Sequence, residues 1–279
     1  MEIPKYIELY RKDLVLKNYA KSSIENYVSQ VTNFLYKHDG KFTEPSKINE
    51  TAIKDWLLLA NSINGRKHRI SALKLFYQLT IKQPMKFKHI EYPRSEKKLP
   101  IVLSVEEIQK MFLVCENLKH KTIFALLYSC GLRVSELINL QWKHIDRSRM
   151  IINIIAAKGN KDRQVMLTPD LIPLLEKYYK EYRSVIYVLN GQNDSAQYSS
   201  RSVGEVIKQL ATKAGIDNKR VYTHLIRHCT FTHLVEQGTD IAIIQKLAGH
   251  SNIKTTNMYC HISHNLISKI QSPLSRIQL

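Results

Sequence analysis

The chain has few of the features that would tie it to a membrane or to an oxidising compartment. Its four cysteines are scattered and form no C-x-x-C pair, which favours a reducing compartment. The longest apolar run, around 123–128, is far too short to cross a bilayer. The first residues also lack the apolar core of a signal peptide. These absences together predict a cytoplasmic protein without a membrane segment.

Acidic residues are also scarce. The chain has 24 Asp and Glu against 42 Lys and Arg, a formal net charge of +18 over 279 residues. Such an excess favours a polyanionic partner, most simply nucleic acid, although a generic basic surface stays open at this point. The length exceeds the common single-domain size, so two domains are expected, each with its own core.

The two halves of the chain differ in their hydrophobic pattern. Up to about residue 85, apolar residues recur every three or four positions, which predicts a helical bundle. Later in the chain, IINIIAA and RQVML are typical of two short strands joined by a turn at KGNKD. The expected fold class is therefore mainly α with a small antiparallel β-sheet (α+β). We expect a helical domain at 1–85, a basic linker at 86–99 and a second domain at 100–279.

Basic residues concentrate before and within the predicted linker. Between 66 and 98 there are ten basic residues and two acidic ones, and prolines interrupt the second half of this segment. A solvated basic face is the ordinary interpretation. We favour a strap along a DNA backbone, because each cation that neutralises a phosphate releases a counterion. The candidate DNA-binding residues are Arg66, Lys67, Arg69, Lys86, Lys88, Arg94, Lys97 and Lys98.

The first part of the second domain contains three charged residues of interest, which are Arg133, Glu136 and Lys158. Ser104 and Glu107 match a capping box, and a helix is expected over 121–140. Arg133 and Glu136 are three residues apart in that segment, either as an ordinary surface ion pair or, near a bend induced by the glycine, as an arginine held inward by the carboxylate. The predicted hairpin then places Lys158 on its turn.

Several polar residues gather between 223 and 261. Thr223 is expected to cap a helix that carries His224 and Arg227 on one face. Asp240 and Gly249 fit the two ends of a second helix, IAIIQKLA.

The last residues of that stretch continue the pattern. His250 would lie just past the second helix, and Ser251 is expected to cap a third. Tyr259 would fall in the last turns of this helix and face the first one. Each residue alone is more often structural, but the combination can hold and attack a phosphate.

The histidines in this stretch raise the alternative of a metal site. His224 and His228 have the four-residue spacing of a zinc-protease helix. That motif needs Glu directly after the first histidine, whereas Leu225 stands there, and the guanidinium of Arg227 disfavours a cation. No metal site is therefore expected.

Five segments in this order resemble the tyrosine recombinases, the integrase family that includes the Xer and Cre enzymes: GLRVSEL, AAKGNKDR, HLIRH, LAGH and the final tyrosine. The resemblance covers about Leu99 to the end, and the first domain fits the family's core-binding domain more loosely. Ile226 replaces the family's usual Leu, an apolar exchange. The resemblance implies the catalytic residues Arg133, Lys158, His224, Arg227, His250 and Tyr259, with the last as nucleophile.

The implied chemistry suits these residue types. Two guanidiniums match the non-bridging oxygens of a phosphodiester, whose charge grows in the transition state. A phenol needs a base as it attacks, for which His224 is the candidate, and Lys158 could protonate the leaving 5′ oxygen while His250 bonds the phosphate. The phosphotyrosine bond conserves the energy of the broken one. We expect no cofactor, ATP or metal, and the chain has no G-x-x-x-x-G-K-[ST] loop.

Two other functions stay open. A type IB topoisomerase uses closely similar residues to relax DNA, and a non-catalytic protein could keep the fold for DNA binding alone. The early first helix favours a simple-site enzyme of Xer or Cre type, or a small mobile-element integrase. Apolar residues at helical spacing in the tail predict docking on a neighbouring subunit, within a tetrameric complex on double-stranded DNA.

Overall fold

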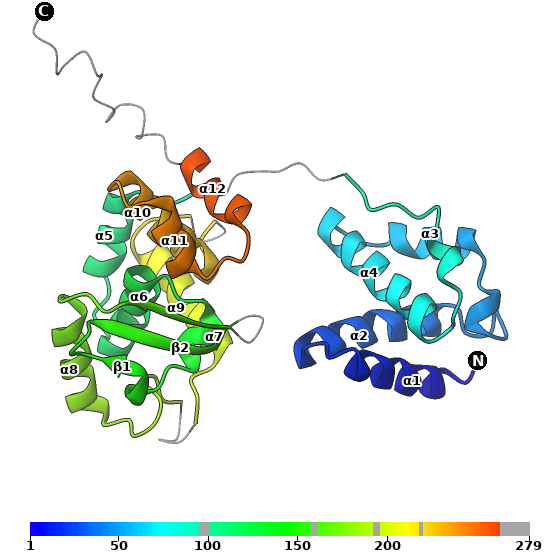
Figure 1. Cartoon of the computed structure of the whole chain (residues 1–279), viewed down its shortest axis with the longest axis horizontal. Helices are drawn as coiled ribbons and strands as arrows, with labels where there is room; N and C mark the ends of the chain where they lie inside the picture. Colours follow the sequence, from blue (N-terminus) through cyan, green and yellow to red (C-terminus); the bar gives the residue numbers. More distant parts are fainter. Residues whose placement is uncertain (95–100, 158–160, 192–195, 218–219, 263–279) are drawn as a thin grey trace, which may run out of the picture. The chain divides into compact units, whose positions relative to one another are not determined.

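The computed structural model describes residues 1–94, 101–157, 161–191, 196–217 and 220–262 (Figure 1). The chain divides into two compact units, Met1–Lys97 and Lys98–Leu279. The described elements are mostly helices, together with one three-stranded antiparallel sheet in the second unit. This composition confirms the predicted fold class. No helix in the described ranges is long and apolar enough to span a membrane.

The first unit is a helical bundle, as its hydrophobic period predicts. Its elements are α1 (Ile3–Leu16), α2 (Lys21–Lys37), η1 (Pro45–Lys47), α3 (Glu50–Leu58), α4 (Ile63–Leu79) and η2 (Pro84–Phe87). Asn49 and Ser62 cap α3 and α4 through their side chains. The buried Tyr10 hydroxyl donates to the carbonyl of Ala72 at 2.9 Å, which joins α1 to α4.

Part of the segment predicted as a linker packs onto this first unit. Phe87 and Ile90 are buried in its core, and the ring of Phe87 lies 5.3 Å from that of Tyr77. Beyond Arg94, residues 95–100 lie outside the described part of the chain. The predicted boundaries at 85 and 100 stay a prediction.

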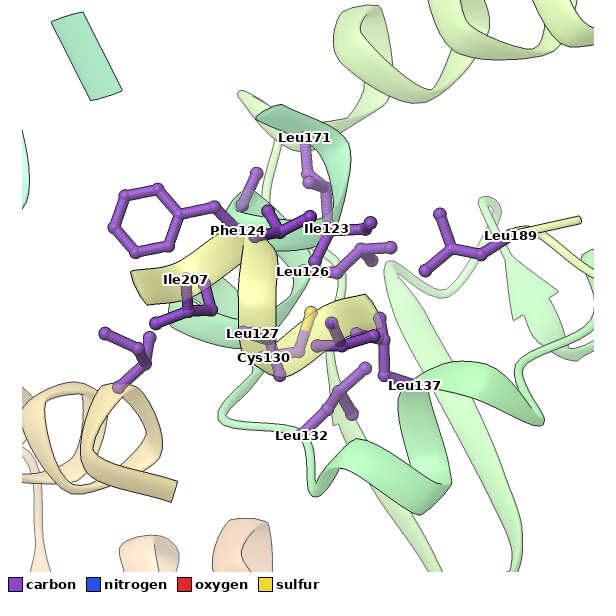
Figure 2. Packing of buried hydrophobic residues seen from close by; sticks show 14 of the residues in the cluster. Ile123, Phe124, Leu126, Leu127, Cys130, Leu132, Leu137, Leu171, Leu189 and Ile207 are labelled. Carbon is purple, nitrogen blue, oxygen red and sulfur yellow. The ribbon is translucent and has the colours of Figure 1, made fainter. Parts of the chain in front are cut away.

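In the second unit, helices and a small sheet pack around the buried helix α6 (Leu118–Cys130). Its elements are α5 (Val105–Leu113), α6 (Leu118–Cys130), α7 (Val134–Ile138), η3 (Trp142–His144), β1 (Ile145–Asp146), β2 (Ile151–Ala157), β3 (Lys161–Met166), α8 (Leu171–Tyr182), α9 (Ser200–Lys213), α10 (Thr223–Glu236), α11 (Ile241–Ala248) and α12 (Ile253–Ile262). The predicted capping box of Ser104 and Glu107 is confirmed at the start of α5. Figure 2 shows α6 contributing Ile123, Phe124 and Leu127 to the core beside Ile207 of α9.

The predicted helix over 121–140 was wrong as a single helix. α6 ends at Cys130, and Gly131 has φ 58°, a left-handed conformation that terminates the helix. A Cβ on Gly131 would lie 2.6 Å from the ring of Phe231, so the glycine also allows α10 to approach. The chain turns here, and α7 starts in a new direction immediately after Arg133.

The predicted hairpin is confirmed, with an additional strand. β2 pairs with β3 in antiparallel register, with Ile152 opposite Val165 and Ile154 opposite Arg163. The short strand β1 pairs with the other edge of β2 and was not predicted, because a two-residue strand carries no periodic signal. Arg163 therefore lies on the face of the sheet that carries the buried apolar residues Ile154 and Val165.

A separate apolar cluster fastens the last three helices together. Phe231 and Val235 of α10, Ile244 and Ala248 of α11, and Tyr259 of α12 form it. Figure 1 shows these helices grouped at one end of the second unit. The cluster therefore holds side chains from three helices in one place.

Candidate active site

Arg227 lies at the buried centre of this helix group. Its side chain is only 1% exposed. The guanidinium donates to the backbone carbonyls of Gly131 and Ala248 and lies 4.8 Å from the centre of the Phe231 ring. Burial, and then the charges of neighbouring arginines, lower the pKa of Arg227 to about 9. The positive charge of Arg227 is therefore not fully balanced by negative charge in its surroundings.

Arg133 and Arg163 share one carboxylate, that of Glu136. Arg133 Nη1 donates to Glu136 Oε1 at 2.8 Å, and Arg163 Nη2 donates to Glu136 Oε2 at 2.7 Å. The carboxylate side chain is 4% exposed, so this is a buried cluster, unlike the surface ion pair considered from the sequence. Burial alone would raise the pKa of Glu136, but bonds and charge from Arg163 and then Arg133 lower it to about 2.

All three guanidiniums donate hydrogen bonds to the last two backbone carbonyls of α11. Arg163 donates to the carbonyl of Leu247. Arg133 Nη2 donates at 3.2 Å to the carbonyl of Ala248, which also accepts from Arg227. A helix C-terminus carries unpaired carbonyls and partial negative charge, so it attracts cations. Three arginines, one directly before α7, one on β3 and one on α10, thereby meet at one point.

Both predicted ends of α11 are confirmed. Asp240 accepts a hydrogen bond from the amide of Ala242 at 2.7 Å, and Gly249 adopts φ 61°. The predicted caps of the flanking helices were wrong. α10 begins at Thr223 itself after Tyr222, without a side-chain cap.

The cap of α12 is also one residue later than predicted. Asn252, not Ser251, accepts the amide of Lys254 at 2.9 Å. Both short polar residues can cap a helix, and the sequence alone did not distinguish between them.

His250 is held just beyond α11 by three hydrogen bonds, one of which runs from its amide to the carbonyl of Gln245 at 3.1 Å. Its carbonyl accepts from Nε2 of Gln245 at 3.1 Å, and its Nδ1 lies 3.1 Å from Oγ1 of Thr256. Burial, and then the charges of the arginines led by Arg227, lower the pKa of His250 to about 4. The ring is therefore neutral at pH 7, with Nδ1 engaged by Thr256.

Tyr259 completes the cluster from the last turns of α12. Its ring is buried against Phe231 of α10, 5.5 Å away, and against His228, 5.8 Å away. The ring of His250 stacks on it at 6.1 Å. Burial raises the pKa of the phenol, and the charge of Arg227 opposes this. The phenol is thus protonated at neutral pH but lies within a field that favours its anion.

The arrangement of these groups suits an anion better than any other ligand. Arg133 and Arg163 share the carboxylate of Glu136, whereas Arg227 donates to backbone carbonyls, so the three arginines and one glutamate near Tyr259 carry two net positive charges. An anion bound here would offset the desolvation of these guanidiniums. Its atoms would also lie beside a nucleophilic hydroxyl. The geometry therefore combines anion binding with a potential attacking group.

The structure brings together four of the six predicted catalytic residues. Arg133, Arg227, His250 and Tyr259 meet as described. His224 is exposed on the first turn of α10, with its ring 4.7 Å from that of His228. Lys158 lies outside the described residues.

The predicted DNA-binding residues differ in their surroundings. Lys88 and Arg94 are exposed, whereas Arg66 and Lys67 are half-buried. Lys97 and Lys98 lie outside the described residues.

Arg69 and Lys86 have contacts within the first unit. Arg69 stacks on the ring of Trp56 at 4.5 Å and donates to its carbonyl at 2.8 Å. Lys86 donates to the carbonyl of Ser46. These two side chains contribute to packing whether or not DNA is bound.

Sequence reasoning missed Arg163 and Thr256. A usable signal existed for Arg163, because alternation along the strand places it on the same face as the buried Val165 and Leu167. An arginine on an apolar face needs buried partners. Nothing in the sequence pointed to Thr256, since its role depends on how α12 returns toward His250.

Among the described residues, no group of three His, Cys, Asp or Glu side chains could hold a metal ion. His228 is half-buried, and its buried Nδ1 has no hydrogen-bond partner. Burial, and then the charges of His224 and Arg227, lower the pKa of His228 to about 4.

Replacement of Gly249 by Ala should destabilise the second unit. Its φ of 61° disfavours any side chain, and a Cβ would lie 2.7 Å from Cδ of Arg163. Gly238→Ala is the matched control, because Gly238 has φ 89° and open space around it. We expect about 1–2 kcal/mol for the control and a larger loss for Gly249→Ala. Urea unfolding measures both, and equal losses would show that Arg163 yields freely.

Acid should destabilise the second unit through two histidines. The folded-state pKa values of His228 and His250 are about 4, below the ordinary value of 6.5. The unfolded chain therefore binds more protons between these values, so their contribution is fully present above pH 6.5 and is lost as the pH falls toward 4. Urea unfolding between these limits should show a smaller pH dependence in His228→Gln and in His250→Gln. Unchanged slopes in both variants would contradict the assignment.

Comparison with known proteins agrees with this geometry. A model of the phage integrase family matches residues 102–265. A putative integrase/recombinase y4qK of Sinorhizobium fredii is 31% identical, over 94% of this chain and 86% of that protein. The tyrosine recombinase XerD of Oceanobacillus iheyensis is 30% identical, over 88% of this chain and 89% of that protein.

The fold has solved counterparts as well. A lambda integrase dimer bound to a COC′ core site superposes with a TM-score of 0.76 at 15% identity, over 96% of this chain and 79% of that one. The matched family region contains all the residues of the arginine and tyrosine cluster. The chain therefore belongs to the phage integrase family, the tyrosine recombinases. Its class of enzyme is the site-specific recombinase.

Proposed function

We propose that this protein cuts and rejoins double-stranded DNA at specific sites through a 3′-phosphotyrosine intermediate, without metal or ATP. The observation that supports this most directly is the position of Tyr259 in the field of Arg227 and Arg133, within a cluster of three arginines whose carboxylate partner is Glu136. A phosphodiester brings one negative charge, and a second develops in the pentacoordinate transition state. The two uncompensated positive charges of the cluster match that transition state.

The proposed cleavage step assigns a role to each group. The hydroxyl oxygen of Tyr259 attacks the phosphorus while its proton passes to His224, so a phosphotyrosine bond forms. The bond to the 5′ oxygen breaks, and Lys158 gives that oxygen a proton. Religation reverses the sequence with a 5′-hydroxyl from a partner strand.

The phosphate itself is held by the remaining residues. Arg133 and Arg227 bind its non-bridging oxygens, and Nε2 of His250 adds a hydrogen bond, since Nδ1 already contacts Thr256. The exposed position of His224 suits a base that meets the phenol only when DNA closes over the site.

DNA is the proposed partner because two observations support it: the positive charge of the chain and a DNA-bound structure of the same fold. The net charge is +18, and the lambda integrase structure of the same fold is bound to a core site. Within the basic segment, Lys88 and Arg94 are the described candidates most free to contact phosphates, since both are exposed.

We further propose a tetrameric synaptic complex joined by the C-terminal tail, which lies outside the described residues. The apolar residues of the tail at helical spacing support this role. The proposed location is the cytoplasm. All four cysteines are free thiols, which is in keeping with a reducing compartment.

One experiment separates this function from its alternatives. Footprinting defines the bound DNA site, and a plasmid with two copies of that site is then incubated with the protein in EDTA. Exchange between paired sites supports recombination. Relaxation of any plasmid without exchange would indicate a topoisomerase, and footprints without strand cleavage would indicate a binding protein.

Two variants extend the same assay. A chain lacking 263–279 should bind a single site normally but fail to join two sites, as seen by native gel mobility. Lys158→Ala should cleave slowly on ordinary DNA and recover on DNA with sulfur as the bridging 5′ atom, because a thiolate leaves without a proton. Normal synapsis by the shortened chain, or equal defects on both substrates, would contradict the respective role.

A further inference from the structure

Arg163 is a buried arginine that the proposed chemistry does not use. It lies on β3, and its side chain is 5% exposed. Each nitrogen of its guanidinium has a protein acceptor. Nε donates to Glu136 Oε1 at 3.2 Å, Nη2 donates to Glu136 Oε2 at 2.7 Å, and Nη1 donates to the carbonyl of Leu247. All three nitrogens of Arg163 are thus engaged by protein acceptors, and its burial keeps the guanidinium away from a phosphate.

The partners of Arg163 are the groups that hold the site together. Glu136 accepts both the backbone amide of Arg133, at 2.7 Å, and its Nη1, at 2.8 Å. The carbonyl of Leu247 is adjacent to that of Ala248, which binds the other two arginines. Arg163 thus connects the carboxylate behind Arg133 to the backbone turn that precedes His250.

Local packing leaves this connection little freedom. Cδ of Arg163 would lie 2.7 Å from a Cβ on residue 249, so the aliphatic stem lies directly against the backbone of Gly249. A buried fork with a carboxylate on one side and a carbonyl on the other fixes both in orientation as well as distance. The turn from α11 to His250 is consequently fastened to the sheet.

We propose that Arg163 is a positioning residue for strand cleavage, which sets the orientation of Arg133 through Glu136 and the position of His250 through the end of α11. This inference rests on the proposed function. Without Arg163, the carboxylate of Glu136 would have Arg133 as its one remaining arginine partner among the described contacts. It would then draw that guanidinium away from the phosphate.

The substitutions Arg163→Met and Arg163→Lys separate orientation from charge. Met keeps much of the apolar stem and removes the charge. Lys keeps the charge, but its single ammonium cannot replace the planar fork. Arg147→Met is the matched control, because Arg147 forms an ion pair of 2.8 Å with Glu176 at the surface of the same unit.

The first measurement follows cleavage on a half-site substrate with a nick beside the scissile phosphate, so that the short 5′ fragment leaves and the covalent adduct accumulates. At saturating protein, we expect both Arg163 variants to form the adduct about 100-fold more slowly than the wild type, the cost of a misplaced catalytic group. Half-site affinity should stay within about threefold, and Arg147→Met should match the wild type.

The second measurement is the pKa of His250, followed by NMR titration and assigned with His250→Gln. The charge of Arg163 is one of the causes that lower this pKa. Arg163→Met should therefore raise it, while Arg163→Lys should leave it low despite slow cleavage. A loss of packing alone would not separate the two variants in this way.

The outcomes distinguish the inference from the function on which it rests. A wild type that forms no adduct overturns both. A wild type that forms the adduct, with an Arg163→Met or Arg163→Lys variant equally fast, overturns the inference alone. Should Arg163→Met not fold, the rate of Arg163→Lys still decides, because full activity with lysine would show that charge suffices without positioning.

Discussion

Tyr259→Phe should abolish the covalent protein–DNA adduct. The substitution removes only the hydroxyl oxygen that would form the bond to phosphorus, so the expected loss exceeds about 10⁴-fold. The ring is 1% exposed and packs on Phe231 and His228, contacts that phenylalanine preserves. The fold and the DNA affinity should therefore remain. The measurement is a denaturing gel of the half-site reaction in EDTA.

A matched variant controls for the loss of a buried phenol. Tyr178 is also fully buried in the second unit, and its hydroxyl donates to Oδ1 of Asn190 at 3.3 Å. Tyr178→Phe should form the adduct at close to the wild-type rate. If Tyr259→Phe still formed the adduct, another residue would be the nucleophile, and the proposed mechanism would be wrong.

Arg227→Met should inactivate the enzyme with little change in stability. In catalysis, it removes a charged donor at the proposed phosphate site, and one such donor is commonly worth about 10²–10³-fold in rate. A larger loss is expected here, because the missing charge also leaves the phenol of Tyr259 in a less favourable field.

The expected stability follows from opposing terms. The lowered pKa of Arg227 corresponds to roughly 5 kcal/mol against the buried charge. Its two hydrogen bonds to the carbonyls of Gly131 and Ala248 favour the fold by about 1.5–3 kcal/mol each. The terms nearly cancel, so Arg227→Met should lie within about 2 kcal/mol of the wild type.

Lysine at position 227 provides the sharper comparison. Arg227→Lys keeps a buried charge but cannot reach both carbonyls with a planar fork, and ammonium is more strongly hydrated. We expect Arg227→Lys to be no more stable than Arg227→Met, although it is the more conservative change. Since Trp56 lies in the first unit and Trp142 in the second, fluorescence in a Trp56→Phe background reports unfolding of the second unit. A large destabilisation in the methionine variant alone would contradict this balance of terms.

Helix positions were the best predicted part of the fold, because they depend on local patterns. Ser104 and Glu107, Asp240 and Gly249 each act on backbone groups within a few residues, and all were confirmed. The errors occurred where local signals compete. A bend was expected at Gly131, but only the structure showed that the helix ends there and that Phe231 packs against the glycine.

The candidate site was predictable to the extent that residue type carries the chemistry. A tyrosine, two arginines, a lysine and two histidines in family order give the candidate residues without any geometry. Their contacts were not predictable in the same way. The alternatives for Arg133 and Glu136, a surface pair or an inward one, were resolved by the burial of the carboxylate between two arginines.

The sequence by itself determined the class of the fold, the helices around the site and the residue types available for attack on a phosphate. Periodicity, caps and motif order are local properties, so they can be read along the chain. Only the tertiary structure decided that Arg163 joins Glu136 to the end of α11, and that Thr256 holds His250. These contacts join residues from different elements. The free-energy cost of burying each charge depends on which partners the tertiary packing places beside it.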